Sequence, residues 1–246
     1  MVARRLNAAS FRHAILTLVF SVAPSPVAEA QPIGRPPTIR QWRCGAGVDA
    51  GYHADSSGFT NSLALPFYAE TKTIATTYAV PSAAAFDANF HCEGRRGLGF
   101  GVGLTYHDKS SDGTVTASVP HPFFFNQPRS VSGQATGLGR SELGINFDAV
   151  WLAPAADRVQ LLLLAGPSVI RVTQELVTDI SVRSSYPFDQ ATFDSAASSQ
   201  QTKSSLGFNA GADLAYMFTS RIGVGGSIQY SHARATLSAA DGGTAA

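Results

Sequence analysis

Residues 97–107 read GLGFGVGLTYH, and this stretch decides the fold class. Every second side chain in it is large and apolar: Leu98, Phe100, Val102, Leu104 and Tyr106. The positions between them hold glycine, threonine and histidine. Successive side chains of a β-strand point to opposite faces of the sheet, whereas a helix would scatter these five around its axis. The stretch therefore predicts a strand with one apolar face and one nearly bare face.

The same alternation recurs in six other segments, so the sequence predicts seven strands. The other six are residues 42–52, 84–92, 142–151, 158–173, 205–218 and 221–231. Short connections alternate with three long ones of about thirty residues each, namely 53–82, 108–141 and 174–204. Loops of that length are uncommon inside compact domains, but short turns alternating with long loops are typical of membrane β-barrels. We therefore expect an all-β, antiparallel up-and-down transmembrane β-barrel.

The composition agrees with a sheet that has one apolar outer face. Charged residues make up 14% of the chain and hydrophobic residues 44%, so the surface is short of charge. The chain holds no apolar run of about 20 residues that could span a bilayer as a helix. The formal net charge is +1, which gives no indication of a nucleic-acid partner.

The apolar face is predicted to meet lipid, with a soluble lipocalin-like barrel as the competing interpretation. No Lys, Arg, Asp or Glu falls on that face within the clear strands. Aromatic residues, which favour a membrane interface, lie near the strand ends. They are Trp42, Tyr52, Tyr106, Trp151, Tyr216, Phe218 and Tyr230. The opposite face is rich in glycine and poor in Lys and Glu, which suits a tight interior better than contact with water.

The N-terminus has the pattern of an export signal. Residues 1–30 combine a basic start with Arg4, Arg5 and Arg12, a short apolar run over residues 14–23, and the small-residue cleavage pattern Ala28-Glu29-Ala30. We predict a signal peptide over residues 1–30, a Pro-rich leader over 31–41, and a barrel domain over 42–246. Removal of the signal, which carries a net +2, leaves the mature chain at 1 − 2 = −1.

From Trp42 onward the chain resembles the small bacterial outer-membrane β-barrel family, the OmpA-like eight-stranded proteins. The segments that show the resemblance are GLGFGVGLTYH at Gly97, SELGINFDAVW at Ser141, LGFNAGADLAYMF at Leu206 and RIGVGGSIQY at Arg221. The resemblance implies the outer membrane of a Gram-negative bacterium as location, with its lipid and the barrel assembly machinery as partners. Single-chain bacterial barrels have an even number of strands. We therefore expect eight strands, of which seven are evident and the last is truncated, unless part of residues 63–80 supplies another.

The two cysteines lie at the same end of one predicted hairpin. Cys44 opens the first strand and Cys92 closes the second, and both fall on the apolar face. Directly opposed residues in a sheet bring their Cβ atoms within about 4.5–5.5 Å, near disulfide range. The sequence leaves a disulfide and two free thiols as equal alternatives.

Several polar side chains are predicted to point into the barrel. They are Asp49, Asp87, Asn89, Asn146, Asp148, Asn209, Asp213 and Gln229. An eight-stranded barrel is just wide enough to be filled by its own side chains, so we expect a hydrogen-bonded interior rather than a wide pore. The functional alternative is that these side chains line a polar pathway or a ligand pocket.

No reaction can be identified from the sequence. The histidines lack metal-site spacing, and no G-x-S-x-G motif occurs, so we expect no catalytic residue, metal or cofactor. The leading hypothesis is a structural or surface-interaction barrel. The alternatives are a barrel that binds or passes a small, apolar ligand at its external loops, and a rim-site enzyme acting on lipids or peptides.

Overall fold

The structure is a computed structural model that describes residues 9–22, 42–53, 57–80, 82–156, 158–219, 222–235 and 237. These residues form ten strands and one short 3-10 turn, η1 (Arg95–Gly97). The strands are β1 (Ala9–Val22), β2 (Arg43–His53), β3 (Ser57–Phe67), β4 (Glu70–Val80), β5 (Ala83–Glu93), β6 (Leu98–Val119), β7 (Arg129–Ala156), β8 (Val159–Arg183), β9 (Thr192–Met217) and β10 (Ile222–Ala235). The fold is therefore all-β, as the sequence predicts.

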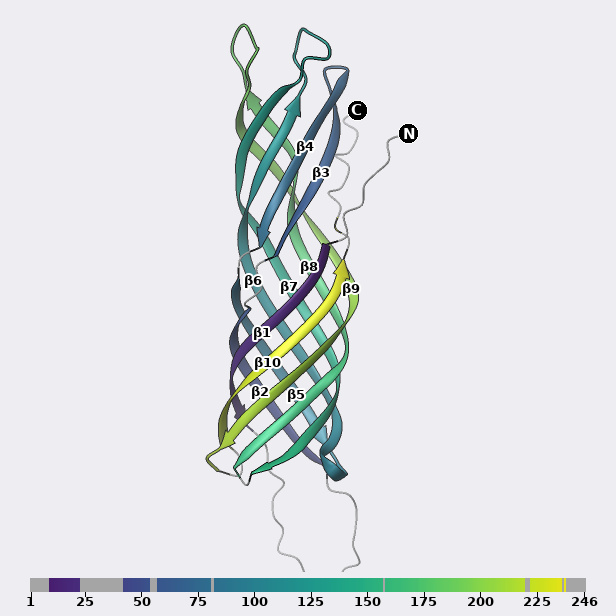
Figure 1. Cartoon of the computed structure of the whole chain (residues 1–246), viewed down its shortest axis with the longest axis vertical. Coiled ribbons are helices and arrows are strands. Elements are labelled where there is room, and N and C mark those ends of the chain that lie inside the picture. The colour runs from purple at the N-terminus through teal and green to yellow at the C-terminus, as the bar shows by residue number, and fades with distance from the viewer. Residues whose placement is uncertain are drawn as a thin grey trace, which may run out of the picture.

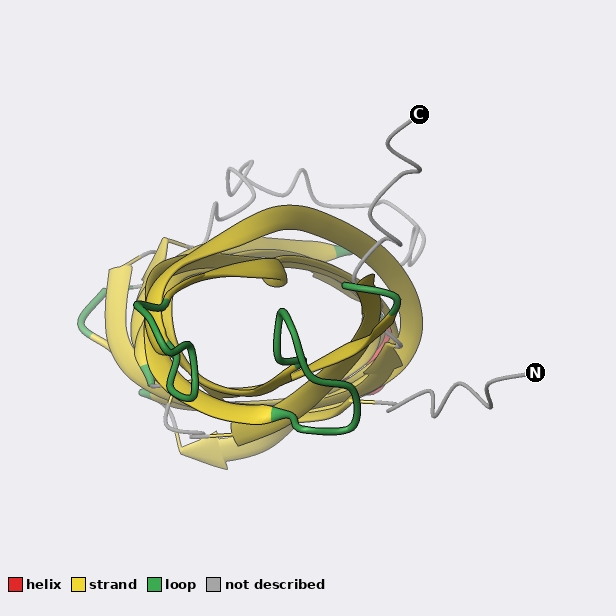
Figure 2. Cartoon of the chain, turned by 90° about the horizontal axis from the view of Figure 1, so that it is seen from above, coloured by secondary structure: helices red, strands yellow, loops and turns green. Residues whose placement is uncertain are grey.

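Eight of the strands form a closed antiparallel ring. Its order is β6-β5-β2-β1-β10-β9-β8-β7, and the pairing of β7 with β6 completes the circle. The strands are tilted against the long axis (Figure 1), and they run around that axis as a ring when viewed along it (Figure 2). Tilted strands are what closure of an eight-stranded sheet requires.

The remaining two strands form a hairpin beside the upper part of the barrel (Figure 1). In this β3–β4 hairpin, β4 pairs with β6 over Thr73–Tyr78 and Gly113–Ser118. Part of residues 63–80 thus does form strands, but they pair with the upper part of β6 and supply no member of the ring. The upper sheet consists of this hairpin and the distal halves of β6, β7, β8 and β9.

Strand β1 occupies the place of the eighth strand. It pairs along its length with β10, from Ala9 opposite Ala235 to Val22 opposite Ile222, and also with β2. The sequence analysis places these residues within the predicted export signal, where they include Arg12 of the basic start and most of the apolar run. The remainder of that signal lies outside the described residues, as does the Pro-rich leader. Export and cleavage remain predictions, and β1 is a strand that the sequence analysis did not anticipate.

Most of the expected long loops are strand. β6 continues to Val119, β7 begins at Arg129, β8 reaches Arg183, and β9 begins at Thr192. Residues 113–119 of β6 and 130–135 of β7 also alternate, but Ser, Thr and Gln occupy the exposed positions and small residues the buried or half-buried ones. Such Ser- and Thr-rich sequence is easily interpreted as loop, which explains the shortened strand predictions.

A β-bulge in β7 separates its lower and upper parts. Ser111 pairs with Leu138 and Gly113 with Ala135, so β7 holds one extra residue here. Gly137 lies in the bulge with a φ of 73°, a conformation that glycine adopts readily. The bulge changes which β7 positions face inward: even-numbered residues such as Arg140 are buried below it, and odd-numbered ones such as Val131 above it.

The apolar core lies inside the upper part of the molecule. Its buried members come from β4, β6, β7 and β8: Ile74, Tyr78, Val115, Ala117, Val119, Val131, Ala135, Leu138, Leu176, Val177 and Ile180. The β3–β4 hairpin packs against this cluster with Phe59, Leu63 and Leu65. The upper half therefore has the arrangement of a water-soluble β-protein, with an apolar interior.

Candidate functional site

The outer surface of β6 changes character along the strand. From Leu98 to Tyr106 the exposed positions are apolar, and from Asp108 to Thr116 they are Asp, Ser and Thr. The inward positions change in the opposite sense, from glycine, Thr105 and His107 to Val115, Ala117 and Val119. The barrel thus has an apolar outside and a polar inside in its lower half, and the reverse in its upper half.

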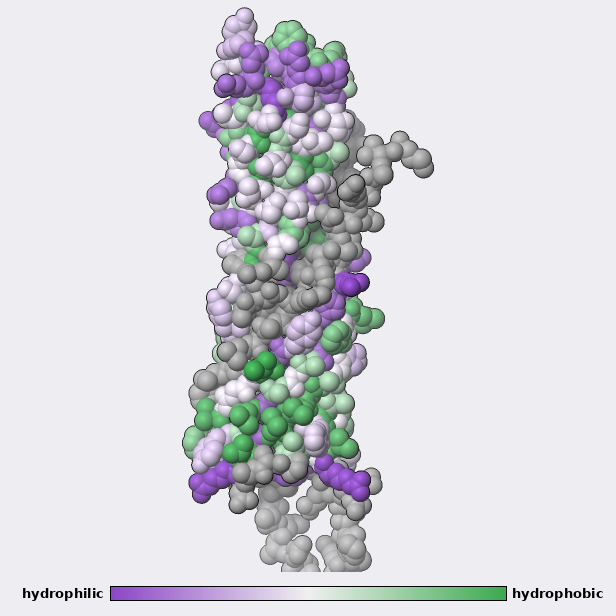
Figure 3. Space-filling model, viewed as in Figure 1, coloured by the Kyte–Doolittle hydropathy of each residue, from purple (hydrophilic) through white to green (hydrophobic). Residues whose placement is uncertain are grey.

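The other strands of the lower half share this apolar outer face. Figure 3 shows hydrophobic residues gathered over the lower part and mostly hydrophilic ones above. Large exposed apolar side chains of this belt include Val48, Phe86, Phe90, Phe147, Leu163, Leu206, Phe208, Leu214 and Ile228. All seven aromatics expected at the strand ends are exposed: Trp42, Tyr52, Tyr106, Trp151, Tyr216, Phe218 and Tyr230. We call this surface the apolar belt.

The predicted interior residues lie on the inward face of the lower half. Asp49, Asn146, Asp148 and Asn209 are buried, while Asp87, Asn89, Asp213 and Gln229 are half-buried. The Asn89 amide donates to Asp49 Oδ2 at 3.0 Å, and Asn209 Nδ2 donates to the Gly166 carbonyl at 3.2 Å. These contacts link β5 to β2 and β9 to β8 across the inner wall.

A buried charged cluster lies inside the barrel at the level where the outer face changes. Arg140 donates to Glu142 through Nε and Nη2, and its Nη1 donates to Gln174 Oε1 at 3.1 Å. His107 Nε2 lies 3.4 Å from Glu142 Oε2. Arg140 is 1% exposed and Gln174 0%, so both are shielded from bulk water. We call these four residues the lumen cluster.

The lumen cluster was not identified from the sequence. Arg140 and Gln174 fall at the edges of the two segments interpreted as loops, and the contacts connect three strands. The sequence gives one indication of the cluster: Arg140 and Glu142 are separated from Asn146 and Asp148 by even numbers of positions. In a regular strand they therefore point to the same, inward face. A cavity of about 20 Å³ next to His107 and Glu142 has room for about one water molecule.

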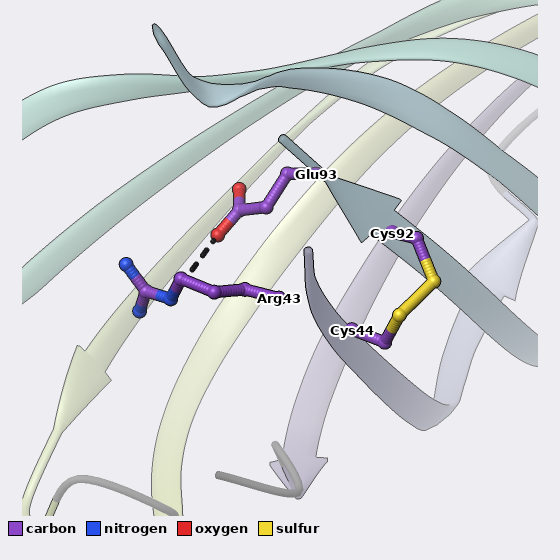
Figure 4. The surroundings of a disulfide bond; sticks show 4 residues. All are labelled: Arg43, Cys44, Cys92 and Glu93. Atoms are coloured by element: carbon purple, nitrogen blue, oxygen red, sulfur yellow. Dashed lines mark ion pairs between the residues drawn. A yellow bond between two sulfur atoms is a disulfide. The ribbon is translucent and has the colours of Figure 1, made fainter. Parts of the chain in front are cut away.

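Cys44 and Cys92 face one another at the lower ends of β2 and β5. They are a direct register pair, and their sulfurs are joined in a disulfide with an S–S distance of 2.02 Å. The neighbouring pair, Arg43 and Glu93, lies on the other side of the two strands, with Nε 3.6 Å from Oε1 (Figure 4). A covalent bond and an ion pair thus join these two strands at one level.

Neither a metal centre nor a spanning helix is found in the described part of the chain. No three or more His, Cys, Asp or Glu side chains there are grouped to hold a metal ion. Among the same residues, no helix has the length and apolar character needed to cross a membrane. No protein-family model matches this sequence, and no curated protein is similar to it at a significant level.

Proposed function

We propose that this chain is a barrel of the Gram-negative outer membrane with a structural or surface-interaction role. Its lower half spans the bilayer, and its upper half projects outward and presents the tip loops. The observation that carries the proposal is the apolar belt. On β6 the belt extends over nine residues, Leu98 to Tyr106, and a tilted membrane strand needs about 9–11.

A water-soluble barrel is a poor alternative for the lower half. In such a barrel Phe100, Phe147 and Phe208 would fill the centre, but all three are exposed on the outside. An apolar patch of this size is rare on soluble monomers. The upper half, by contrast, has a polar outer face suited to water.

The packing of side chains inside the barrel supports the proposal that it does not conduct ions. The lumen cluster is buried at the junction of the two halves, and above it the core residues Tyr78, Val115 and Leu176 are fully buried. A water-filled passage would leave lining side chains exposed. This packing favours the structural interpretation over transport of a small ligand through the lumen.

Migration on gels and surface labelling test the membrane assignment. We expect the purified protein to require detergent, and to migrate differently before and after boiling because a closed barrel resists detergent at room temperature. A cysteine introduced by Phe124→Cys, at the tip, should react with a membrane-impermeant maleimide on whole cells. Protein that stays monodisperse in buffer without detergent would contradict the proposal.

Planar bilayer recording tests the closed interior separately. The reconstituted protein should give no stepwise conductance, whereas steady channel events would overturn the non-conducting part and leave the membrane assignment standing.

A further inference from the structure

The tip of the molecule is formed by two loops that hold one another in place. They connect β6 to β7 (residues 120–128) and β8 to β9 (residues 184–191), and lie among the green segments of Figure 2. The rings of Phe123 and Phe188 meet edge to face at 5.5 Å. Arg129 Nη1 donates to the Phe188 carbonyl at 3.1 Å, and Nη2 donates to the Pro120 carbonyl at 2.9 Å. Arg129, the first residue of β7, thus holds the backbones of both loops, and the two rings join the loops directly.

A pocket of about 490 Å³ opens between these loops. Its lining residues are His121, Gln127, Pro128, Arg129, Ser130, Asp189, Gln190 and Ala191. The volume lies within the range of about 300–1,000 Å³ that is usual for small-molecule sites. The pocket belongs to the upper half, so it exists whether or not the apolar belt meets lipid.

Arg129 brings an incompletely compensated positive charge to this wall. The residue is only 7% exposed, its two carbonyl partners are neutral, and its Nε has no hydrogen-bond partner. Among the described residues, no carboxylate forms an ion pair with it. A buried guanidinium without an anionic partner is costly, and carboxylate or phosphate groups are the partners that match its geometry.

His121 adds a second donor in a fixed orientation. Its Nδ1 accepts the backbone N–H groups of Phe123 and Phe124, at 3.1 and 3.2 Å. The proton of the neutral ring is therefore on Nε2, which lies 3.7 Å from Asp189 Oδ1. The His121 side chain is 2% exposed, whereas the Asp189 side chain is 70% exposed. Asp189 is thus a loosely held carboxylate at the mouth of a pocket that contains two buried donors.

We propose that this tip pocket binds a small organic anion through a carboxylate or phosphate group, which Arg129 and His121 hold. The carboxylate or phosphate of the ligand displaces the Asp189 carboxylate, which lies 3.7 Å from His121 Nε2, and accepts a hydrogen bond from that nitrogen. Asp189 is then a competitor of the ligand, and its removal should strengthen binding.

Calorimetric titration of the full chain in a non-ionic polyoxyethylene detergent tests the proposal. The probes are inorganic phosphate, glucuronate, and glucose as the neutral match for glucuronate. We expect phosphate or glucuronate to bind and glucose not to bind. Arg129→Gln should weaken binding at least tenfold, and Asp189→Asn should strengthen it severalfold. Arg183→Gln, which removes an exposed arginine paired with Asp194 outside the pocket lining, should change nothing.

The variant pair separates ligand binding from a structural role for Arg129. If Arg129 only joins the two loops, Arg129→Gln loosens the tip, but Asp189→Asn has no reason to raise anion affinity. Equal binding of glucose and glucuronate would overturn the proposal, as would unchanged affinity in Asp189→Asn. Binding to phosphatidylglycerol vesicles without binding of either free anion would also overturn it, because the site would then recognise a lipid surface.

Discussion

Two residues on the outer face of β6 distinguish the two environments of the barrel. Val102 lies in the middle of the apolar belt, and Thr114 is exposed on the same face above it. We expect Val102→Arg to lower the free energy of unfolding by roughly 2–4 kcal/mol, because the charge would lie near the bilayer centre. Thr114→Arg should change it by no more than about 0.5 kcal/mol. Urea titration in lipid vesicles measures both, and equal effects would show that the belt does not meet lipid.

Tyr78 should make the upper half sensitive to alkali. Its side chain is fully buried against Phe59, and Val177 N donates to its Oη at 2.8 Å. Burial raises the pKa of Tyr78, and the Val177 hydrogen bond opposes that shift only in part. The unfolded phenol ionises near pH 10 and the folded one at higher pH, so its contribution to stability is complete below about pH 10 and is lost as the pH rises further.

Phenolate absorbance measures this titration directly. The wild type should show a tyrosine that ionises late, and Tyr78→Phe should remove it. Tyr186→Phe, at an exposed tip position, should leave that late component unchanged. A spectrum that is the same for wild type and Tyr78→Phe would contradict the expectation.

At the scale of elements, the sequence predicts the lower strands well and the upper ones poorly. Residues 97–107 are unambiguous because large apolar groups alternate with glycine. Residues 113–119, GTVTASV, alternate equally well, but small apolar residues point inward and Ser or Thr outward, which is also the composition of loops. The lumen cluster and the tip pocket depend on pairing between strands that are distant in the sequence. A single sequence does not show which residues pair across strands, so these contacts could not be predicted.

The β3–β4 hairpin covers the upper core, so its removal should affect the upper half alone. Replacing residues 57–80 with a short Gly-Ser linker deletes Ile74 and Tyr78 and exposes Val115 and Leu176, which pack in the same cluster. We expect chymotrypsin to cut the upper strands far faster than in the wild type. The heat-dependent migration of the barrel should persist, because the ring order does not include β3 or β4. Loss of both properties together would mean that the two halves fold as one unit.

At the scale of the whole molecule, closure depends on β1. This strand lies between β2 and β10, and removing it leaves unpaired backbone groups on both neighbours. We expect chain 31–246, refolded in detergent, to lose its unboiled gel position at a lower temperature than chain 1–246. Equal resistance would show that the ring closes without this segment. The mass of the protein recovered from membranes decides whether cleavage after Ala30 occurs.

The β-bulge at Gly137 restricts the insertions and deletions by which the upper half of the barrel could become longer or shorter. Above it, inward and outward positions of β7 are exchanged, and Val131 and Arg129 face inward only because of that offset. Loss of one residue there would turn Ser130 and Ser132 toward the core and expose the valine. Natural or engineered lengthening of the projection should therefore proceed in steps of two residues on each strand, and single-residue insertions should be confined to the turns.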